Sequence, residues 1–507
     1  MKEKKKERNQ PPLIPSILGG DFIKGKFAFG KTLYQKGEGW EGMIFLLVLI
    51  LFALCACTVG PNYRRPDVSG ITPKDWRWKQ AAPGDRIPKG KWWRIFHDPV
   101  LDGLEGIAVA GNQDLRAAVA RVDEARAAAR QSRSAFFPEL SLDPSANRQR
   151  TSGHLPTPIP IPVPPSYIST YSVPFDLSYE VDLWGRVRRS FEAAGAEAQA
   201  SAADYQNVLL TLTSDVAADY FLVRSMDEEI DALKRTVRSR DESVRMLRDR
   251  FNAGAIPEID LDRAQTELAG ARSDLAAEAR QRALTLHALA VLLGKPASSF
   301  EIAPGQVAAS LPVIRAGLPS SLLERRPDVA RAERLLAAAN ARIGAAEAAR
   351  FPAISLTGQA GFLSSEAKNL FSSDSQVWTL GVGVSLPLFT GGRISAQVGQ
   401  ARAAYLESLA KYRETVLGAF RDVEDSLSEI AFLNEQAASV DEALASARRV
   451  YALSGARYGA GAVSYLDVVD AQRDVLRQRR EKARLEGQRF AATVRLIKAL
   501  GGGWSEK

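Results

Sequence analysis

The chain has 507 residues and carries 67 Lys and Arg against 59 Asp and Glu, a net charge of +8. Half of this small excess lies in residues 1–56, and no basic stripe with interleaved aromatic side chains remains, so the sequence does not favour nucleic-acid binding. The two cysteines, Cys55 and Cys57, and three scattered histidines provide no disulfide framework and no metal-ligand motif for the rest of the chain. No nucleophile–base pair or phosphate-binding loop is found either, so we expect neither an enzyme nor a cofactor.

The chain begins with a predicted signal region. Residues 43–56 are almost wholly apolar and follow a segment that contains several lysines. At about 1.5 Å per residue this run spans about 21 Å, less than the ~30 Å hydrocarbon core, so we expect a signal peptide over residues 1–56. The Leu-Cys-Ala-Cys sequence that ends at Cys57 resembles a bacterial lipobox and predicts a covalent lipid on that residue, with 57–100 as a lipidated N-terminal tail. An ordinary cleaved signal with an incidental cysteine is the alternative.

The next predicted elements are a helix over residues 101–135 and a β-hairpin over 139–183. Apolar residues occupy every second position of 171–183, which is the pattern of a strand with one apolar face. The length of this run suits a strand that crosses a bilayer at a tilt. The proline-rich connector 155–165 predicts an exposed loop of polyproline type.

A long helix is predicted to follow the hairpin. Residues 186–253 contain no proline and a single glycine, and at about 1.5 Å per residue they predict a rod of about 100 Å. Gly254 is expected to end this rod in a tight turn, and a shorter helix is expected to return over 260–293. Residues 101–302 therefore form one predicted unit.

The second half of the chain repeats the first. A shift of 207 residues aligns the halves from the second strand onward and carries residues 253–255 onto 460–462; upstream the shift becomes 214. Residues 303–319 are expected to link the two units. The second unit, 320–502, is then predicted to contain a helix to residue 350, a hairpin over 353–389, a long helix over 393–460 and a shorter helix over 467–500.

The predicted strands cannot close a barrel within one chain. Four strands fall short of about eight, the working minimum for a barrel. Open strand edges are not tolerated in lipid, so the chain is expected to assemble with copies of itself. Two chains would give eight strands and three would give twelve. The long helices follow the strands directly, so we expect them to extend the barrel as a helical cylinder.

Several stretches resemble the TolC-like outer-membrane efflux family, in the lipid-anchored branch associated with resistance-nodulation-division pumps. The matching stretches are residues 57–66, 92–101 and 318–328, together with the Arg-aromatic-x-x-Gly turn that occurs in both halves. The resemblance extends from residue 57 to about residue 502. It implies a mostly helical fold with a membrane β portion, in which a homotrimer forms a twelve-stranded β-barrel continuous with a long α-helical barrel.

The resemblance also implies a function. The chain is expected to be the lipid-anchored, outer-membrane exit channel of a tripartite efflux system that extends into the periplasm. It would receive small toxic compounds from a periplasmic adaptor protein and an inner-membrane pump. Two alternatives remain open, namely a duct for type I protein or peptide secretion and an envelope-spanning tether that does not conduct.

The family match assigns roles to residues near the two turns. Leu466, Asp467 and Asp470 match its periplasmic gate, where three copies would place six carboxylates around a narrow opening that attracts cations. The alternative is that both acids only begin a helix and interact favourably with its dipole. Asp260 and Tyr458 match a closed-state link between the two helix pairs. The family's adaptor-docking tips correspond to Ala253, Gly254, Ala255, Ala460, Gly461 and Ala462.

Overall fold

The structure is a computed structural model that describes residues 58–77, 90–152, 167–307, 311–314, 319–323 and 325–502. Every described residue belongs to one compact unit within Cys55–Lys507. The expected signal region 1–56, the expected lipid acceptor Cys57 and the connector 155–165 lie outside the described residues. None of the described helices is both long enough and apolar enough to cross a membrane.

Two short 3-10 turns and two helices precede the sheet. The turns are η1 (Ser69–Ile71) and η2 (Trp92–Phe96), and the helices are α2 (Pro99–Gly111) and α3 (Gln113–Ser134). The sequence predicts one helix here, but Asn112 divides it, because its backbone leaves the helical region with φ −64° and ψ 132°. Its side-chain oxygen instead caps α3 by accepting a hydrogen bond from the backbone N–H three residues further on, at 2.8 Å.

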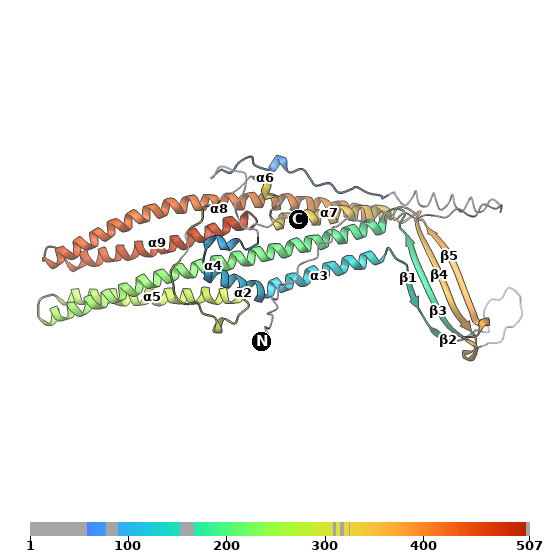
Figure 1. Cartoon of the computed structure of the whole chain (residues 1–507), viewed down its shortest axis with the longest axis horizontal. Coiled ribbons are helices and arrows are strands. Elements are labelled where there is room, and N and C mark those ends of the chain that lie inside the picture. Colours follow the sequence, from blue (N-terminus) through green and yellow to red (C-terminus); the bar gives the residue numbers. More distant parts are fainter. Residues whose placement is uncertain are drawn as a thin grey trace, which may run out of the picture. The chain divides into compact units, whose positions relative to one another are not determined.

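The strands form one antiparallel sheet in the order β1, β3, β4, β5 (Figure 1). β3 (Tyr167–Val181) pairs with β4 (Ala353–Ser364), which pairs with β5 (Gln376–Ser385). Both β1 (Glu139–Leu142) and β2 (Ser145–Arg150) pair with the other side of β3. Five strand segments therefore fill the four strand positions that the sequence predicts.

Prolines explain why the first predicted strand is divided. Pro144 lies between β1 and β2, and Pro174 lies in β3 where these two segments meet. Proline has no backbone N–H, so ladder hydrogen bonds are lost on both strands, although the Asp143 N–H still donates to the Pro174 carbonyl at 3.3 Å. In the described part of the sheet, the outer edges of β1, β2 and β5 have no paired neighbour.

One face of the sheet is apolar and the other is polar. The register aligns Val181 with Ile354 and Ile354 with Val384, and the same alignment of apolar residues continues along the three strands. On the polar face, the Gln359 amide donates to the Asp176 carboxylate at 2.7 Å. Large apolar side chains on a strand that stay exposed are typical of a surface that meets lipid. On β5 these side chains are 66–78% exposed, namely Trp378, Leu380, Val382 and Val384.

Two helices lie between the halves of the chain. α6 (Pro319–Leu322) is a single turn, and α7 (Pro327–Ala348) packs against α4, the first long helix. The sequence predicts one helix from residue 320 to 350, but the chain is extended at Arg326, with φ −86° and ψ 120°. The reason is local, since the residue before a proline is sterically disfavoured in the helical region.

Each half continues from the sheet into a long helix and a shorter one. α4 (Arg186–Asn252) and α5 (Glu258–Leu292) follow β3, and α8 (Arg393–Gly459) and α9 (Tyr465–Ala499) follow β5. Every bound lies within two residues of the one that the sequence predicts. α4 lies alongside α5 and α9, and α8 lies alongside α9 and α7 (Figure 1).

The main core lies where helices of both halves meet the N-terminal segment. Trp92, Phe96, Phe221 and Phe490 belong to it, and none of these side chains is more than 1% exposed. The rings of Phe221 in α4 and Phe490 in α9 stack with their centroids 4.4 Å apart. The two halves are therefore joined by a shared core as well as by the sheet.

Candidate functional site

Two tight turns, at residues 253–255 and 460–462, carry the side chains that the sequence analysis assigns to adaptor docking. Gly254 and Gly461 have φ values of 71° and 74°, which residues with a side chain rarely adopt. In each turn, the glycine N–H and the following alanine N–H donate to carbonyls of the last helical turn at 2.8–2.9 Å. A Cβ atom at either glycine would meet no atom within 4 Å, so both turns are open at the surface.

α9 begins with a capping box built from Ser464 and Asp467. The Asp467 carboxylate accepts hydrogen bonds from the Ser464 hydroxyl at 2.6 Å and from the Ser464 backbone N–H at 3.0 Å. The bond from the hydroxyl, which favours the charged form, lowers the pKa of Asp467. Asp467 therefore has the helix-starting role that the alternative interpretation describes, and its carboxylate is exposed and charged at neutral pH.

Leu466 and Asp470, the other two predicted gate residues, lie in the first two turns of α9. Leu466 is 39% exposed. The Asp470 carboxylate lies 3.0 Å from the Arg473 guanidinium one turn further along the helix, and both side chains are about half exposed. A ring of these acids requires neighbouring chains, so their role as a gate stays a prediction.

Asp260 and Tyr458, the predicted closed-state link, have separate partners. Asp260 pairs with Arg263 at 3.7 Å, on its own helix α5. The Tyr458 ring lies 5.5 Å from the Tyr465 ring of α9, and the Arg250 guanidinium of α4 lies 5.9 Å from the same ring centroid. No hydrogen bond joins Asp260 to Tyr458 in the part of the chain that the structure describes. Tyr458 nevertheless contacts both helix pairs, and the link itself stays a prediction.

An ion-pair network that the sequence analysis does not identify joins the two helix pairs near the turns. The Glu267 carboxylate of α5 lies 2.9 Å from Arg240 of α4 and 3.0 Å from Arg473 of α9. The Arg240 and Glu267 side chains are only 6% and 12% exposed, and burial lowers the pKa of Arg240. The sequence contains one signal for this network, because Arg240 lies at helical spacing between the apolar residues Val237 and Val244 and so falls on the buried face of its helix.

A small apolar core borders this network. It packs Val244 and Leu247 of α4 against Leu261 and Leu268 of α5 and against Val469 of α9. Tyr465, the first residue of α9, is buried in the same cluster. The ends of the two helix pairs are thus held together by apolar contacts and by buried charge.

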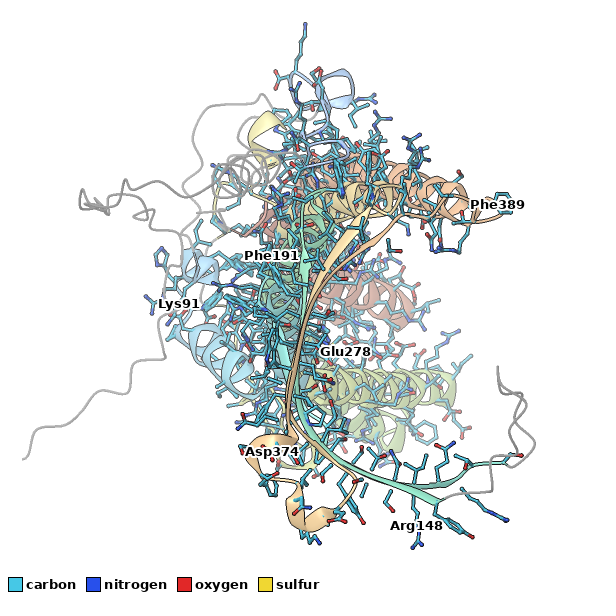
Figure 2. The ribbon with its side chains drawn as sticks, turned by 90° about the vertical axis from the view of Figure 1, so that its right-hand side faces the viewer. Lys91, Arg148, Phe191, Glu278, Asp374 and Phe389 are labelled. Atoms are coloured by element: carbon cyan, nitrogen blue, oxygen red, sulfur yellow. The ribbon has the colours of Figure 1, made fainter. Side chains whose placement is uncertain are left out.

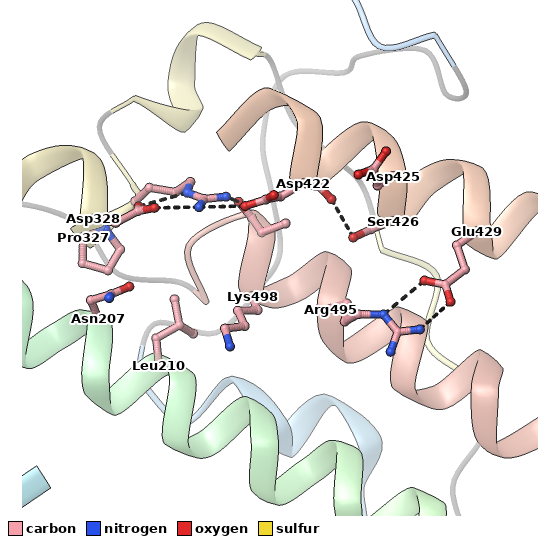
Figure 3. Close-up of a pocket in the computed structure, with 12 residues that line it drawn as sticks. Asn207, Leu210, Pro327, Asp328, Asp422, Asp425, Ser426, Glu429, Arg495 and Lys498 are labelled. Atoms are coloured by element: carbon pink, nitrogen blue, oxygen red, sulfur yellow. Dashed lines mark hydrogen bonds and ion pairs between the residues drawn. The ribbon is translucent and has the colours of Figure 1, made fainter. Parts of the chain in front are cut away.

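A cavity of about 350 Å³ lies between α4, the start of α7, α8 and α9 (Figure 3). The Arg326 guanidinium lies 2.6 Å from Asp328 and 3.0 Å from Asp422, and Arg495 lies 2.5 Å from Glu429. Lys498, the third cation of the lining, pairs with Asp215 of α4 at 3.5 Å. Each cation that lines this cavity therefore has an acidic partner, so we interpret the cavity as a structural junction between α4, α7 and the second helix pair. No group of three or more His, Cys, Asp and Glu side chains could hold a metal ion within the described ranges.

Glu105 of α2 is a buried acid without a partner. Its side chain is 0% exposed, and neither carboxylate oxygen has a hydrogen-bond partner among the described residues. A cavity of about 430 Å³ lies beside it. Burial, reinforced by the negative charge of Asp102, raises the pKa of Glu105 to about 10, so the carboxyl is neutral at pH 7.

Comparison with known proteins shows extensive similarity. The family model described as "Outer membrane efflux protein" matches residues 106–295 and 318–502. The chain is 35% identical over 471 residues to the toluene efflux pump outer membrane protein TtgI of Pseudomonas putida, covering 91% of this chain and 98% of that relative. It is 33% identical over 468 residues to the pyoverdine export outer membrane protein OpmQ of Pseudomonas aeruginosa, covering 92% and 97%. Its structure matches that of the CmeC outer membrane channel of Campylobacter jejuni with a TM-score of 0.83 and 26% identity, over 89% of this chain and 96% of that one.

Proposed function

Because the chain belongs to the outer membrane efflux protein family, we propose that it is the exit duct through which an efflux system releases small organic compounds from the cell. The observation that supports this most strongly is that one chain joins an apolar sheet directly to two very long helices. An exposed apolar sheet face suits the outer membrane, and two helices of 67 residues, about 100 Å each, lead directly away from it. The relatives are named for toluene and pyoverdine, which are small organic molecules.

Conductance tests the duct directly. Purified protein inserted into a planar lipid bilayer should give discrete single-channel openings, and deletion of its gene should sensitise cells to toxic organic compounds. A protein that inserts without any conductance would instead act as a tether. A protein that conducts while its deletion leaves tolerance unchanged would point to a different cargo, such as a secreted peptide.

We propose further that the duct is a homotrimer. Three chains would supply twelve strands and would pair the open edges of the sheet, which lipid does not tolerate. Exposed apolar residues on the helices support contact between chains, because such side chains are normally covered. They include Leu284 and Val291 on α5 and Leu406, Leu417 and Leu453 on α8, which are 50–69% exposed.

The helical turns are proposed to receive a periplasmic adaptor protein, which connects the duct to an inner-membrane pump. The small side chains at 253–255 and 460–462 and the open space beside both glycines would allow an adaptor helix to approach closely. Substituting leucine for Ala255 and Ala462 should weaken co-purification of the adaptor, with conductance unchanged. Unchanged co-purification would place the docking surface elsewhere.

A lipid on Cys57 is proposed to anchor the N-terminal end of the mature chain. A thioether-linked lipid needs the cysteine sulfur, so Cys57→Ser should abolish incorporation of labelled palmitate. Cys55→Ser is the matched control and should retain the label. Labelling that persists in Cys57→Ser would show that the lipid is attached to another residue.

Leu466, Asp467 and Asp470 are proposed to form the periplasmic gate, because three copies would bring six carboxylates together at the end of the duct. The double variant Asp467→Ala/Asp470→Ala should raise the leak conductance severalfold and weaken block by divalent cations. Asp262→Ala is the control, since it removes an exposed acid near the start of α5 that belongs neither to the proposed gate nor to the predicted closed-state link. If the double variant and the control behave alike, the acids serve only to start α9.

A further inference from the structure

Two arginines lie on the apolar face of the sheet at its end away from the helices. β2 pairs with β3 so that Arg150 faces Tyr167 and Arg148 faces Ser169. Directly paired residues of an antiparallel ladder point to the same side, and odd-numbered residues of β3 form the apolar face, as Val173 does. The side chains of Arg148 and Arg150 therefore share the face that meets lipid, and Figure 2 shows Arg148 projecting from the far end of the strand. The residues that alternate with them on β2 are uncharged amides.

These arginines are held by an aromatic ring and not by an acid. The guanidinium carbons of Arg148 and Arg150 lie 5.3 Å and 5.9 Å from the centroid of the Tyr167 ring. Both arginines are exposed, Tyr167 is 65% exposed, and no acidic side chain within the described ranges forms an ion pair with either cation. A π contact leaves the N–H groups of a guanidinium available, so two positive charges and their donors face outward.

The position along the strand places this cluster at the level of lipid headgroups. A strand that rises about 3.3 Å per residue and tilts by about 40° gains about 2.5 Å of height per residue. Measured from Val181, where β3 meets the helices, an apolar band about 25 Å tall ends about ten residues away, near Tyr171. Arg148 and Arg150 pair with β3 residues two and four positions further on, which is about 5–10 Å beyond the hydrocarbon.

We propose that Arg148, Arg150 and Tyr167 form a binding site for the phosphate groups of an anionic lipid in the outer leaflet. A planar guanidinium can donate two parallel hydrogen bonds to phosphate oxygens, and it is more weakly hydrated than a lysine ammonium. A positive charge that faces the hydrocarbon would be costly, whereas the same charge at the headgroup level costs little and gains a counter-charge. The proposal depends on the membrane position given by the proposed function.

The lipid content of the re-purified protein tests the site. The full chain in neutral detergent is incubated with equimolar phosphatidylglycerol and phosphatidylcholine, purified again, and its bound lipids are counted by mass spectrometry. Wild-type protein should be enriched severalfold in phosphatidylglycerol, and Arg148→Gln/Arg150→Gln should lose that enrichment. Arg238→Gln/Arg248→Gln removes the same charge from exposed positions of α4 and should leave the enrichment intact. Lysine at both β2 positions should give an intermediate value, because the charge remains without the planar donors.

Three results decide the assignment. Equal enrichment in wild type and in Arg148→Gln/Arg150→Gln would overturn it, provided that both proteins elute at the same position in size-exclusion chromatography. Displacement of phosphatidylglycerol by inorganic phosphate at equal concentration would overturn the lipid as the ligand and point to a site for free phosphate. A wild-type protein that fails to conduct but shows the arginine-dependent enrichment would contradict the duct and support the lipid site.

Discussion

The two helical turns of the repeat share their backbone but not their charges. Both end a helix of 67 residues at a glycine with positive φ, and both are closed by the same pair of backbone hydrogen bonds. Under the 207-residue shift Asp260 coincides with Asp467, but Arg263 coincides with Asp470. Only the second copy therefore has an acid at both of these positions. The turn is a common scaffold, and a few side chains set the electrostatics of each copy separately.

The helices that follow the turns differ as well. α5 follows Pro257 and has no side-chain cap, whereas α9 begins with the capping box of Ser464. Glu267 in the first copy binds two arginines from other helices, whereas its counterpart Asp474 pairs at 2.6 Å with Arg477 of its own helix. Of these two equivalent acids, only Glu267 of the first copy therefore forms an ion pair between the two helix pairs.

The largest expected effect comes from Glu267→Ala. The change leaves the buried Arg240 without a carboxylate, so the free energy of unfolding should fall by about 3–5 kcal/mol. Asp474→Ala removes an exposed pair at the equivalent position and should cost less than about 1 kcal/mol. Urea unfolding followed by helical circular dichroism measures both variants. Equal losses would mean that the two copies are held in the same way.

A second difference between the copies concerns pH. Glu105 coincides with Pro319 under the 214-residue shift, so only the first copy buries an acid here. The raised pKa of about 10 means that between pH 4.5 and 10 the folded chain holds a proton that the unfolded chain has lost, and stability falls as pH rises. Relative to Glu105→Gln, wild type should therefore lose about 3 kcal/mol between pH 6 and pH 8.

Urea midpoints at the two pH values measure this difference. Glu124→Gln, at an exposed position on α3, is the control and should follow wild type. A Glu105→Gln variant with the same pH dependence as wild type would show that the Glu105 carboxyl is ionised or hydrated in the folded protein.

The smallest expected effect is at the start of α9. Ser464→Ala removes the hydroxyl of the capping box and should cost about 1 kcal/mol, since the first turn loses its side-chain cap. Amide hydrogen exchange should accelerate in the first turn of α9 and not in the first turn of α5, which has no such cap. Ser439→Ala, on an exposed turn in the middle of α8, is the matched control. Unchanged exchange in α9 would mean that packing of Tyr465 holds the first turn without the cap.

The local elements of the fold could be predicted from the sequence, because their signals are local. The lack of proline in these segments, and the glycine turns that follow them, predicted the bounds of both long helices to within one residue. The errors also have local causes. The break at Asn112 requires knowing that its side chain caps the next helix, and the break before Pro327 reflects the steric effect of a proline on Arg326. The division of the first strand depends on Pro144 meeting Pro174, which are distant in sequence.

In the candidate site, the sequence could predict only those roles that depend on contacts within a single helix turn. Asp467 was expected at the start of a helix, and it lies there. The partners of Glu267 come from α4 and α9, and no periodicity in one helix specifies which residue of another helix it will meet. The orphan acid Glu105 was missed for the same reason, since its burial is produced by the packing of α2 against the rest of the core.

The unpaired edges of the sheet have a consequence for biogenesis. Among the described residues, the outer edges of β1, β2 and β5 carry backbone donors and acceptors without a paired neighbour, so a solitary newly exported chain would be poorly suited to enter the bilayer in this form. For the proposed trimer, association would then precede or accompany insertion, and the rate of insertion should rise more steeply than in proportion to the amount of precursor. Supply of the precursor, and the chaperones that keep it from aggregating along those edges, would control how many ducts a cell can build.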